Sequence, residues 1–301
     1  MIDVQSVRKR FGPVVALDGV SLSVRPGERV ALVGTNGSGK TTLLRALCGL
    51  LRVEGRVHLY GEDVARVPQR ALARLAYMPQ VAPPLEVPVA ELVRAHCALR
   101  SRTPAQVAER ARRLGLDLES VARTRVRDLS GGMKQKLLAA LALTAEAPVL
   151  VCDEPTANLD AHARAAFFEE VNARDEDDIL VLCSHRLEEV RHLVDRVIEL
   201  KDGRVVKDAP LSQVLSSLRT FRVELAFGEA VLDEPALGQL RAQGFARVAP
   251  GRFLGVFQGV EKMAVISGLV AAFGDRLVDL SVLDAESLAE AEAVPRLRRV
   301  K

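Results

Sequence analysis

One short stretch combines residue types and spacing that suit phosphate chemistry. Residues 34–41 are GTNGSGKT, between an apolar run ending at Val33 and an amphipathic run containing Leu43 and Leu44. Glycines let a backbone turn with its N–H groups inward, and such groups bind phosphate oxygens together with a helix N-terminus. The residues expected to bind nucleotide phosphates are Gly34, Thr35, Asn36, Gly37, Ser38, Gly39, Lys40, Thr41 and Thr42.

Two side chains of this loop would act on the phosphates directly. Lys40 would place a positive charge on the β- and γ-phosphates, and the hydroxyl of Thr41 would ligate a Mg²⁺ ion that bridges them. The loop alone would serve GTP as well as ATP. However, no N-K-x-D segment that reads guanine is present, and the nearest, NARD at 172–175, lacks the lysine.

A pair of carboxylates ends a second apolar run, VLVCDEP at 149–155. Asp153 can hold the Mg²⁺ shell, and Glu154 beside it can polarise a water molecule for attack on the γ-phosphate. Read alone, the pair has a less favoured alternative, a helix cap or a pair of surface acids. His185 ends the next apolar run and could reach the γ-phosphate, although single histidines at strand ends usually have structural roles.

The elements that must position these residues alternate between strands and helices. Fully apolar runs at 147–155 and 177–185 are typical of buried parallel strands, and residues 86–145 have a helical pattern. We therefore expect an α/β domain over 1–212 with a helical subdomain at about 81–145. Residues 219–301 predict a small ferredoxin-like domain in the order β-α-β-β-α-β. This domain would stabilise a dimer or serve as a packing module, or would sense a ligand.

Composition narrows the class of protein. The 301 residues are 49% hydrophobic and 27% charged with a net charge of +3, so a large core is possible and nucleic-acid binding is not indicated. The four cysteines are scattered without C-x-x-C spacing, which favours reduced, buried thiols. No secretory signal and no run of about 20 apolar residues is found, so a membrane role would need a partner.

The stretch LSGGMKQKLLAALALTAEAPVLVCDEPTANLD at 129–160 resembles the ATP-binding-cassette (ABC) ATPases, and the resemblance covers residues 1–210. It implies a P-loop NTPase sandwich with a helical subdomain, and ATP and Mg²⁺ as cofactors. It assigns adenine stacking to Phe11 and a Mg²⁺ contact to Gln80. The other matches are the signature Ser130, Gly131 and Gly132, the metal ligand Asp153, the catalytic Glu154, the D-loop Asn158, Leu159 and Asp160, and the switch His185.

Two positions depart from the family pattern. Phe11 replaces the commoner tyrosine and keeps the stacking face. Met133 stands where glutamine usually ends the signature, and methionine cannot make an amide hydrogen bond to the ribose. A weaker contact from the signature of one chain to the nucleotide of another is expected, without full loss of activity.

The resemblance also implies partners. The phosphate loop of one chain and the signature of another close on one ATP, so a homodimer or a pair with a close paralogue is expected. A separate transmembrane permease would hold the chain at the cytoplasmic face of the inner membrane, with residues 80–91 as its socket or as a plain loop. The domain order is similar to ABC-2-type exporters. An importer ATPase, or an ABC ATPase that acts on DNA or ribosomes without a permease, remains an alternative.

Overall fold

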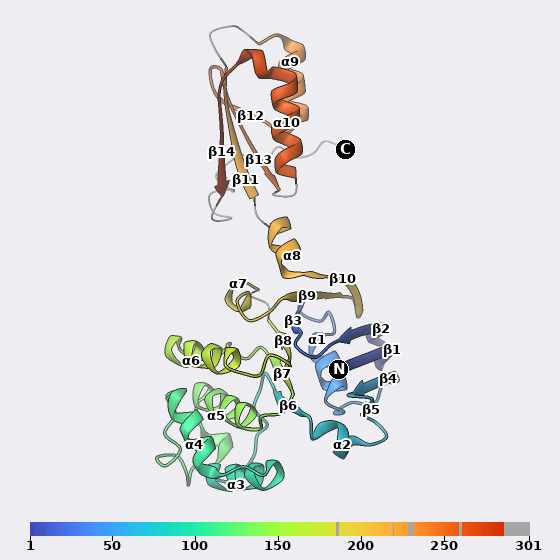
Figure 1. The fold of residues 1–301 in the computed structure, drawn as a ribbon, viewed down its shortest axis with the longest axis vertical. Helices are drawn as coiled ribbons and strands as arrows, with labels where there is room; N and C mark the ends of the chain where they lie inside the picture. Colours follow the sequence, from blue (N-terminus) through green and yellow to red (C-terminus); the bar gives the residue numbers. More distant parts are fainter. Residues whose placement is uncertain (185–186, 219, 228–231, 259–260, 286–301) are drawn as a thin grey trace. The chain divides into compact units, whose positions relative to one another are not determined.

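The computed structural model describes residues 1–184, 187–218, 220–227, 232–258 and 261–285. The chain divides into two compact units, Met1–Leu211 and Ser212–Lys301 (Figure 1). Among the described residues the first unit contains two sheets and the second unit one, and each unit has its own apolar core. No helix within the described residues is both long enough and apolar enough to cross a bilayer.

A six-stranded sheet forms the centre of the first unit, in the order β10-β9-β3-β8-β7-β6. Its strands are β3 (Arg29–Val33), β6 (Leu75–Met78), β7 (Val149–Asp153), β8 (Ile179–Cys183), β9 (Arg196–Lys201) and β10 (Arg204–Pro210). All neighbours pair in parallel except β10, which returns antiparallel beside β9. Every residue of β7 and β8 is buried, as expected of parallel strands covered on both faces. The carboxyl ends of β3, β7 and β8 therefore share one edge.

A smaller antiparallel sheet covers one side of this core. It has the order β2-β1-β4-β5, with β1 (Ile2–Phe11), β2 (Val14–Val24), β4 (Glu54–Leu59) and β5 (Glu62–Asp63). Helix α1 (Lys40–Leu47) buries Leu43, Leu44 and Leu47 in one cluster with residues of both sheets. The helix that follows the phosphate loop is thus fixed between two sheets.

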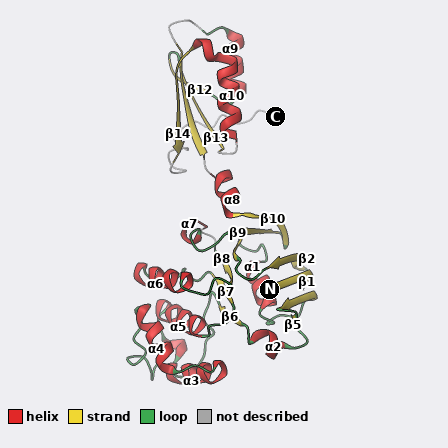
Figure 2. Cartoon of the chain, viewed as in Figure 1, coloured by secondary structure: helices red, strands yellow, loops and turns green. Residues whose placement is uncertain are grey.

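Helices cover the other side of the six-stranded sheet, as Figure 2 shows. Between β6 and β7 lie α3 (Val89–Arg100), α4 (Pro104–Arg113), the short 3₁₀ turn Val126–Asp128 and α5 (Gly131–Thr144). Helix α4 begins with a capping box formed by Thr103 and Gln106, with Pro104 at the first helical position. The remaining helices of this unit are α2 (Pro68–Leu72), α6 (Ala161–Asn172) and α7 (Leu187–Val190).

The second unit begins within helix α8 (Leu211–Leu218) and contains a four-stranded antiparallel sheet in the order β12-β13-β11-β14. Its elements are β11 (Thr220–Phe227), α9 (Glu234–Ala242), β12 (Ala246–Ala249), β13 (Arg252–Gln258), α10 (Lys262–Phe273), the 3₁₀ turn Gly274–Arg276 and β14 (Leu277–Ala285). Phe221, Val223 and Leu225 alternate into a core shared with Leu240 of α9 and Phe273 of α10.

Candidate active site

The loop between β3 and α1 needs glycine at two positions for steric reasons. Gly34 has φ 145°, and a Cβ there would lie 2.2 Å from the carbonyl oxygen of Leu200. Gly39 precedes the helix with φ 106°, and a Cβ there would lie 2.5 Å from the carbonyl oxygen of Ala16. Any other side chain would displace backbone at both places. The predicted strand, loop and helix are confirmed.

The ammonium group of Lys40 lies inside this loop. Its Nζ donates to the carbonyl oxygens of Gly34 at 2.8 Å and Thr35 at 3.0 Å, and the residue is only 8% exposed. The hydroxyl oxygen of Ser38 is also buried, without a hydrogen-bond partner among the described residues. Buried polar atoms of this kind usually have partners, so the loop offers a charge and a free hydroxyl to a ligand.

Asp153 and Glu154 follow each other at the carboxyl end of β7. Burial raises the pKa of Asp153; the Thr41 hydroxyl donates to its carboxylate and opposes the rise, whereas the neighbouring charge of Glu154 adds to it. Oδ2 of Asp153 is buried and has no hydrogen-bond partner in the described part of the chain. One carboxylate oxygen is therefore placed to accept a cation or a donor from a ligand.

One cavity of about 500 Å³ brings most of the predicted residues together. Its lining includes Phe11, Val14, Ala16, Asn36, Gly37, Gly39, Lys40, Thr41, Thr42, Gln80, Asp153 and Glu154. Gly34, Thr35 and Ser38 belong to the same loop, inside which Gly34 and Thr35 bind Lys40. The predicted loop, the carboxylate pair and Gln80 thus surround a single space.

Val14 and Ala16 line the cavity but were not identified by the sequence analysis. Val14 pairs with Phe11 across the turn between β1 and β2, and the two side chains are 62% and 49% exposed. The ring of Phe11 also lies 5.1 Å from Nζ of Lys9. The sequence does contain a signal for Val14, since a short turn between two β-rich runs brings the side chains on either side of the turn together.

Other predicted residues are not part of this cavity. Ser130, Gly131 and Gly132 begin α5 and are absent from the described residues that line it. Ser130 caps the helix, because its Oγ accepts the N–H of Met133 at 3.2 Å. A Cβ at Gly131 would have no neighbour within 4 Å in the described structure. His185 lies outside the described residues.

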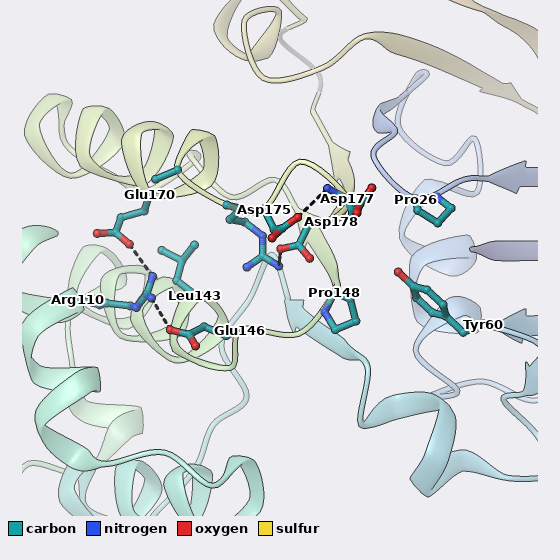
Figure 3. Close-up of a pocket in the computed structure, with 12 residues that line it drawn as sticks. Pro26, Tyr60, Arg110, Leu143, Glu146, Pro148, Glu170, Asp175, Asp177 and Asp178 are labelled. Atoms are coloured by element: carbon teal, nitrogen blue, oxygen red, sulfur yellow. Dashed lines mark hydrogen bonds and ion pairs between the residues drawn. The ribbon is translucent and has the colours of Figure 1, made fainter.

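A larger cavity of about 840 Å³ contains none of the predicted residues in its lining. Figure 3 shows Arg110 of α4 between Glu146 and Glu170, with the aspartates that precede β8 nearby. Nη1 of Arg110 lies 2.6 Å from Glu170, and Nη2 lies 3.0 Å from Glu146. Asp178 pairs with Arg174 at 2.6 Å. The Arg110–Glu170 pair ties α4 to α6, and the Arg110–Glu146 pair ties α4 to the segment after α5.

The comparisons with known proteins agree with this geometry. Residues 17–157 match the family model described as ABC transporter. The Nod factor export ATP-binding protein I of Burkholderia orbicola is 34% identical over 233 residues, covering 74% of this chain and 76% of the relative. The chain belongs to the ABC transporter family. The protein of the same name from Ralstonia nicotianae is 32% identical over 259 residues, covering 82% of this chain and 78% of that protein.

The solved structures that are similar to this chain belong to the same family. An ATP-binding subunit of an ABC transporter matches with a TM-score of 0.62 and 27% identity, over 71% of this chain and 91% of that one. A bacterial ABC transporter cassette solved as a dimer matches with a TM-score of 0.62 and 25% identity, over 70% of this chain and 99% of that one. The first unit therefore has the P-loop NTPase fold of an ABC cassette. The chain is the ATP-binding, ATP-hydrolysing subunit of a transporter.

Proposed function

We propose that this ABC subunit hydrolyses Mg²⁺-ATP in the cavity between Lys40 and Glu154, and that two copies close on two ATP molecules to drive export through a separate permease. One observation carries the chemistry: the phosphate loop, Asp153 and Glu154 line the same space. We also propose an ATPase domain at 1–212, with a helical subdomain at about 81–145, and an accessory domain at 219–301.

The residues present fit a magnesium ion. Thr41, Gln80 and Asp153 offer hydroxyl, amide and carboxylate oxygens in one cavity, and Asp153 Oδ2 lacks a partner among the described residues. Mg²⁺ prefers such oxygens and commonly binds through one or two carboxylates plus substrate phosphates. When bound, the ion would neutralise charge on the β- and γ-phosphates. Lys40 and the loop N–H groups would hold the same phosphates, and Phe11 would stack on the adenine.

Glu154 would act as the general base. Its carboxylate is beside the metal ligand Asp153, and the residue is 9% exposed. A carboxylate within reach of a water molecule can take its proton as the water attacks phosphorus. His185 would contact the γ-phosphate, an assignment that rests on the family pattern.

A second copy would complete each site. Ser130, Gly131 and Gly132 start α5, and the first N–H groups of a helix are unsatisfied donors that favour an anion. These donors do not line the cavity of their own chain, which supports their use on the ATP of a partner. The dimeric cassette among the similar structures supports the same arrangement. ATP would close the dimer, and hydrolysis would release it.

Export is favoured by the relatives named for Nod factor export. The permease would hold the chain at the cytoplasmic face of the inner membrane, and the second unit would pack or stabilise the dimer. In proteoliposomes with the copurified membrane partner, ATP supplied on the cassette side should move cargo away from that side. Movement toward that side would indicate an importer instead. Copurification with ribosomes or DNA and no membrane protein would instead support an ABC ATPase that acts on DNA or ribosomes without a permease.

Glu154→Gln tests the chemistry. The amide keeps the shape of the side chain but cannot take a proton, so the turnover number should fall by about 10²-fold or more while ATP binding persists. The measurement is steady-state phosphate release together with equilibrium binding of ATP. Turnover at the rate of the unmodified protein would refute the role of Glu154.

A further inference from the structure

The backbone at Glu154 adopts a conformation that its sequence opposes. Glu154 has φ 50°, in the left-handed region that residues other than glycine rarely occupy. It also precedes Pro155, and a residue before proline is pushed by steric contact toward extended conformations. The surrounding structure must therefore hold this residue in place.

The left-handed conformation of Glu154 determines which side of the strand its side chain faces. Successive side chains of a strand point to opposite faces, so continued β-structure after Asp153 would direct Glu154 away from it. Both residues nevertheless line the same cavity, and the charge of Glu154 is close enough to raise the pKa of the Asp153 carboxyl. The left-handed residue at the end of β7 breaks the alternation and brings the second carboxylate to the side of the first.

Three hydrogen bonds hold the backbone around the turn, one of them within it, where the N–H of Ala157 donates to the carbonyl oxygen of Glu154 at 3.3 Å. The N–H of Glu154 donates to the carbonyl oxygen of Cys183 on β8 at 3.1 Å. On the other side, Nε2 of Gln135 donates to the carbonyl oxygen of Pro155 at 3.2 Å. Pro155 has no backbone N–H, so its backbone can form hydrogen bonds only through the carbonyl oxygen.

Gln135 comes from α5, the helix that begins with the signature. It is 2% exposed and its bond to Pro155 is buried. The same helix approaches the following loop at a second point, since a Cβ at Gly132 would lie 3.3 Å from the carbonyl oxygen of Asn158. Burying a polar side chain costs free energy unless it is hydrogen-bonded, and here the buried amide of Gln135 bonds to the residue next to Glu154.

We infer that Gln135 is a positioning residue: it holds the carbonyl of Pro155 and thereby keeps the carboxylate of Glu154 in the nucleotide cavity. This rests on the proposed role of Glu154 as general base. Without the bond, the Glu154–Pro155 segment would relax toward extended structure, and the carboxylate would leave the position from which it takes the proton of water.

Gln135→Met tests the inference, because methionine has a similar length and no amide. We expect the turnover number for ATP to fall about tenfold, with KM for ATP changed less than twofold. In a Glu154→Gln background the same substitution should cause no further fall, since the group that it positions is already inactive. Thr144→Val is the matched control: it removes another buried bond of α5, from Thr144 Oγ1 to the carbonyl oxygen of Ala140 at 2.7 Å, and should leave turnover unchanged.

Unchanged turnover in Gln135→Met would overturn the inference. So would a full tenfold fall in the Glu154→Gln background, or an equal fall in Thr144→Val, because each would indicate a general effect on the fold. If Gln135→Met does not fold, Gln135→Asn, which keeps the amide but withdraws it by one methylene, replaces it with the same expectations. A Glu154→Gln variant with normal turnover would instead refute the proposed function itself.

Discussion

Lys40 has two roles that one ammonium group can serve together. Its bonds to Gly34 and Thr35 hold the loop closed on itself, and the same charge faces the cavity where phosphates would lie. The residue type and position followed from the motif. The bonds to the loop carbonyls did not, because they depend on the backbone path between β3 and α1.

Lys40→Ala should weaken ATP binding. A hydrogen bond to a charged group contributes about 1.5–3 kcal/mol, so the dissociation constant for ATP should rise roughly 10- to 100-fold. Isothermal titration calorimetry measures it, with Lys207→Ala on β10 as the control. An unchanged dissociation constant would contradict the assignment of the loop to phosphate binding.

Among the elements, long and fully apolar runs were the most predictable. The buried strands β7 and β8 followed from their apolar runs, and helix α4 lies in the stretch with a helical pattern. The four-residue strand β6 did not, because LAYM is too short to show a period. The left-handed turn at Glu154 was equally hidden, since tertiary bonds to Cys183 and Gln135 impose it against the local preference.

Two of the three glycines of the phosphate loop, Gly37 and Gly39, should respond differently to alanine. Gly37 and Gly39 both have positive φ, at 82° and 106°, which costs a residue with a Cβ about 1–2 kcal/mol. Only at Gly39 would the Cβ also meet backbone, 2.5 Å from the carbonyl oxygen of Ala16. Gly39→Ala should therefore lower the urea midpoint more than Gly37→Ala and should abolish ATP binding. Equal midpoints would contradict the steric explanation.

His96 of α3 should make the helical layer sensitive to acid. Burial lowers its pKa, with Arg100 adding to the effect, while a bond to the backbone of Leu141 opposes it. The unfolded chain then binds more protons once the pH falls below about 6.5. Stability is therefore present above that pH and is lost as the pH falls toward the lowered pKa.

The measurement is the free energy of unfolding in urea between pH 7.5 and pH 5. The loss on acidification should be smaller in His96→Gln than in the unmodified chain. His162→Gln, which changes an exposed histidine of α6, is the control and should retain the full loss. An identical pH dependence in His96→Gln would show that another group is responsible.

At the scale of the whole molecule, each chain has a complete phosphate loop and carboxylate pair, while its signature begins a helix outside that cavity. Sequence motifs predicted the loop, the carboxylate pair and the signature. Single-chain geometry shows that the signature does not meet the other two within one copy, and the proposed dimer brings them together across two copies.

The most direct test is sedimentation of the Glu154→Gln variant with and without Mg²⁺-ATP. We predict a monomer without ATP and a dimer with it. Adding Gly131→Glu should abolish the dimer while each monomer still binds ATP, because the new carboxylate has open space in its own chain but would repel the triphosphate of the partner. An ATP-saturated Glu154→Gln chain that stays monomeric, or a dimer that forms equally well with Gly131→Glu, would contradict the shared site.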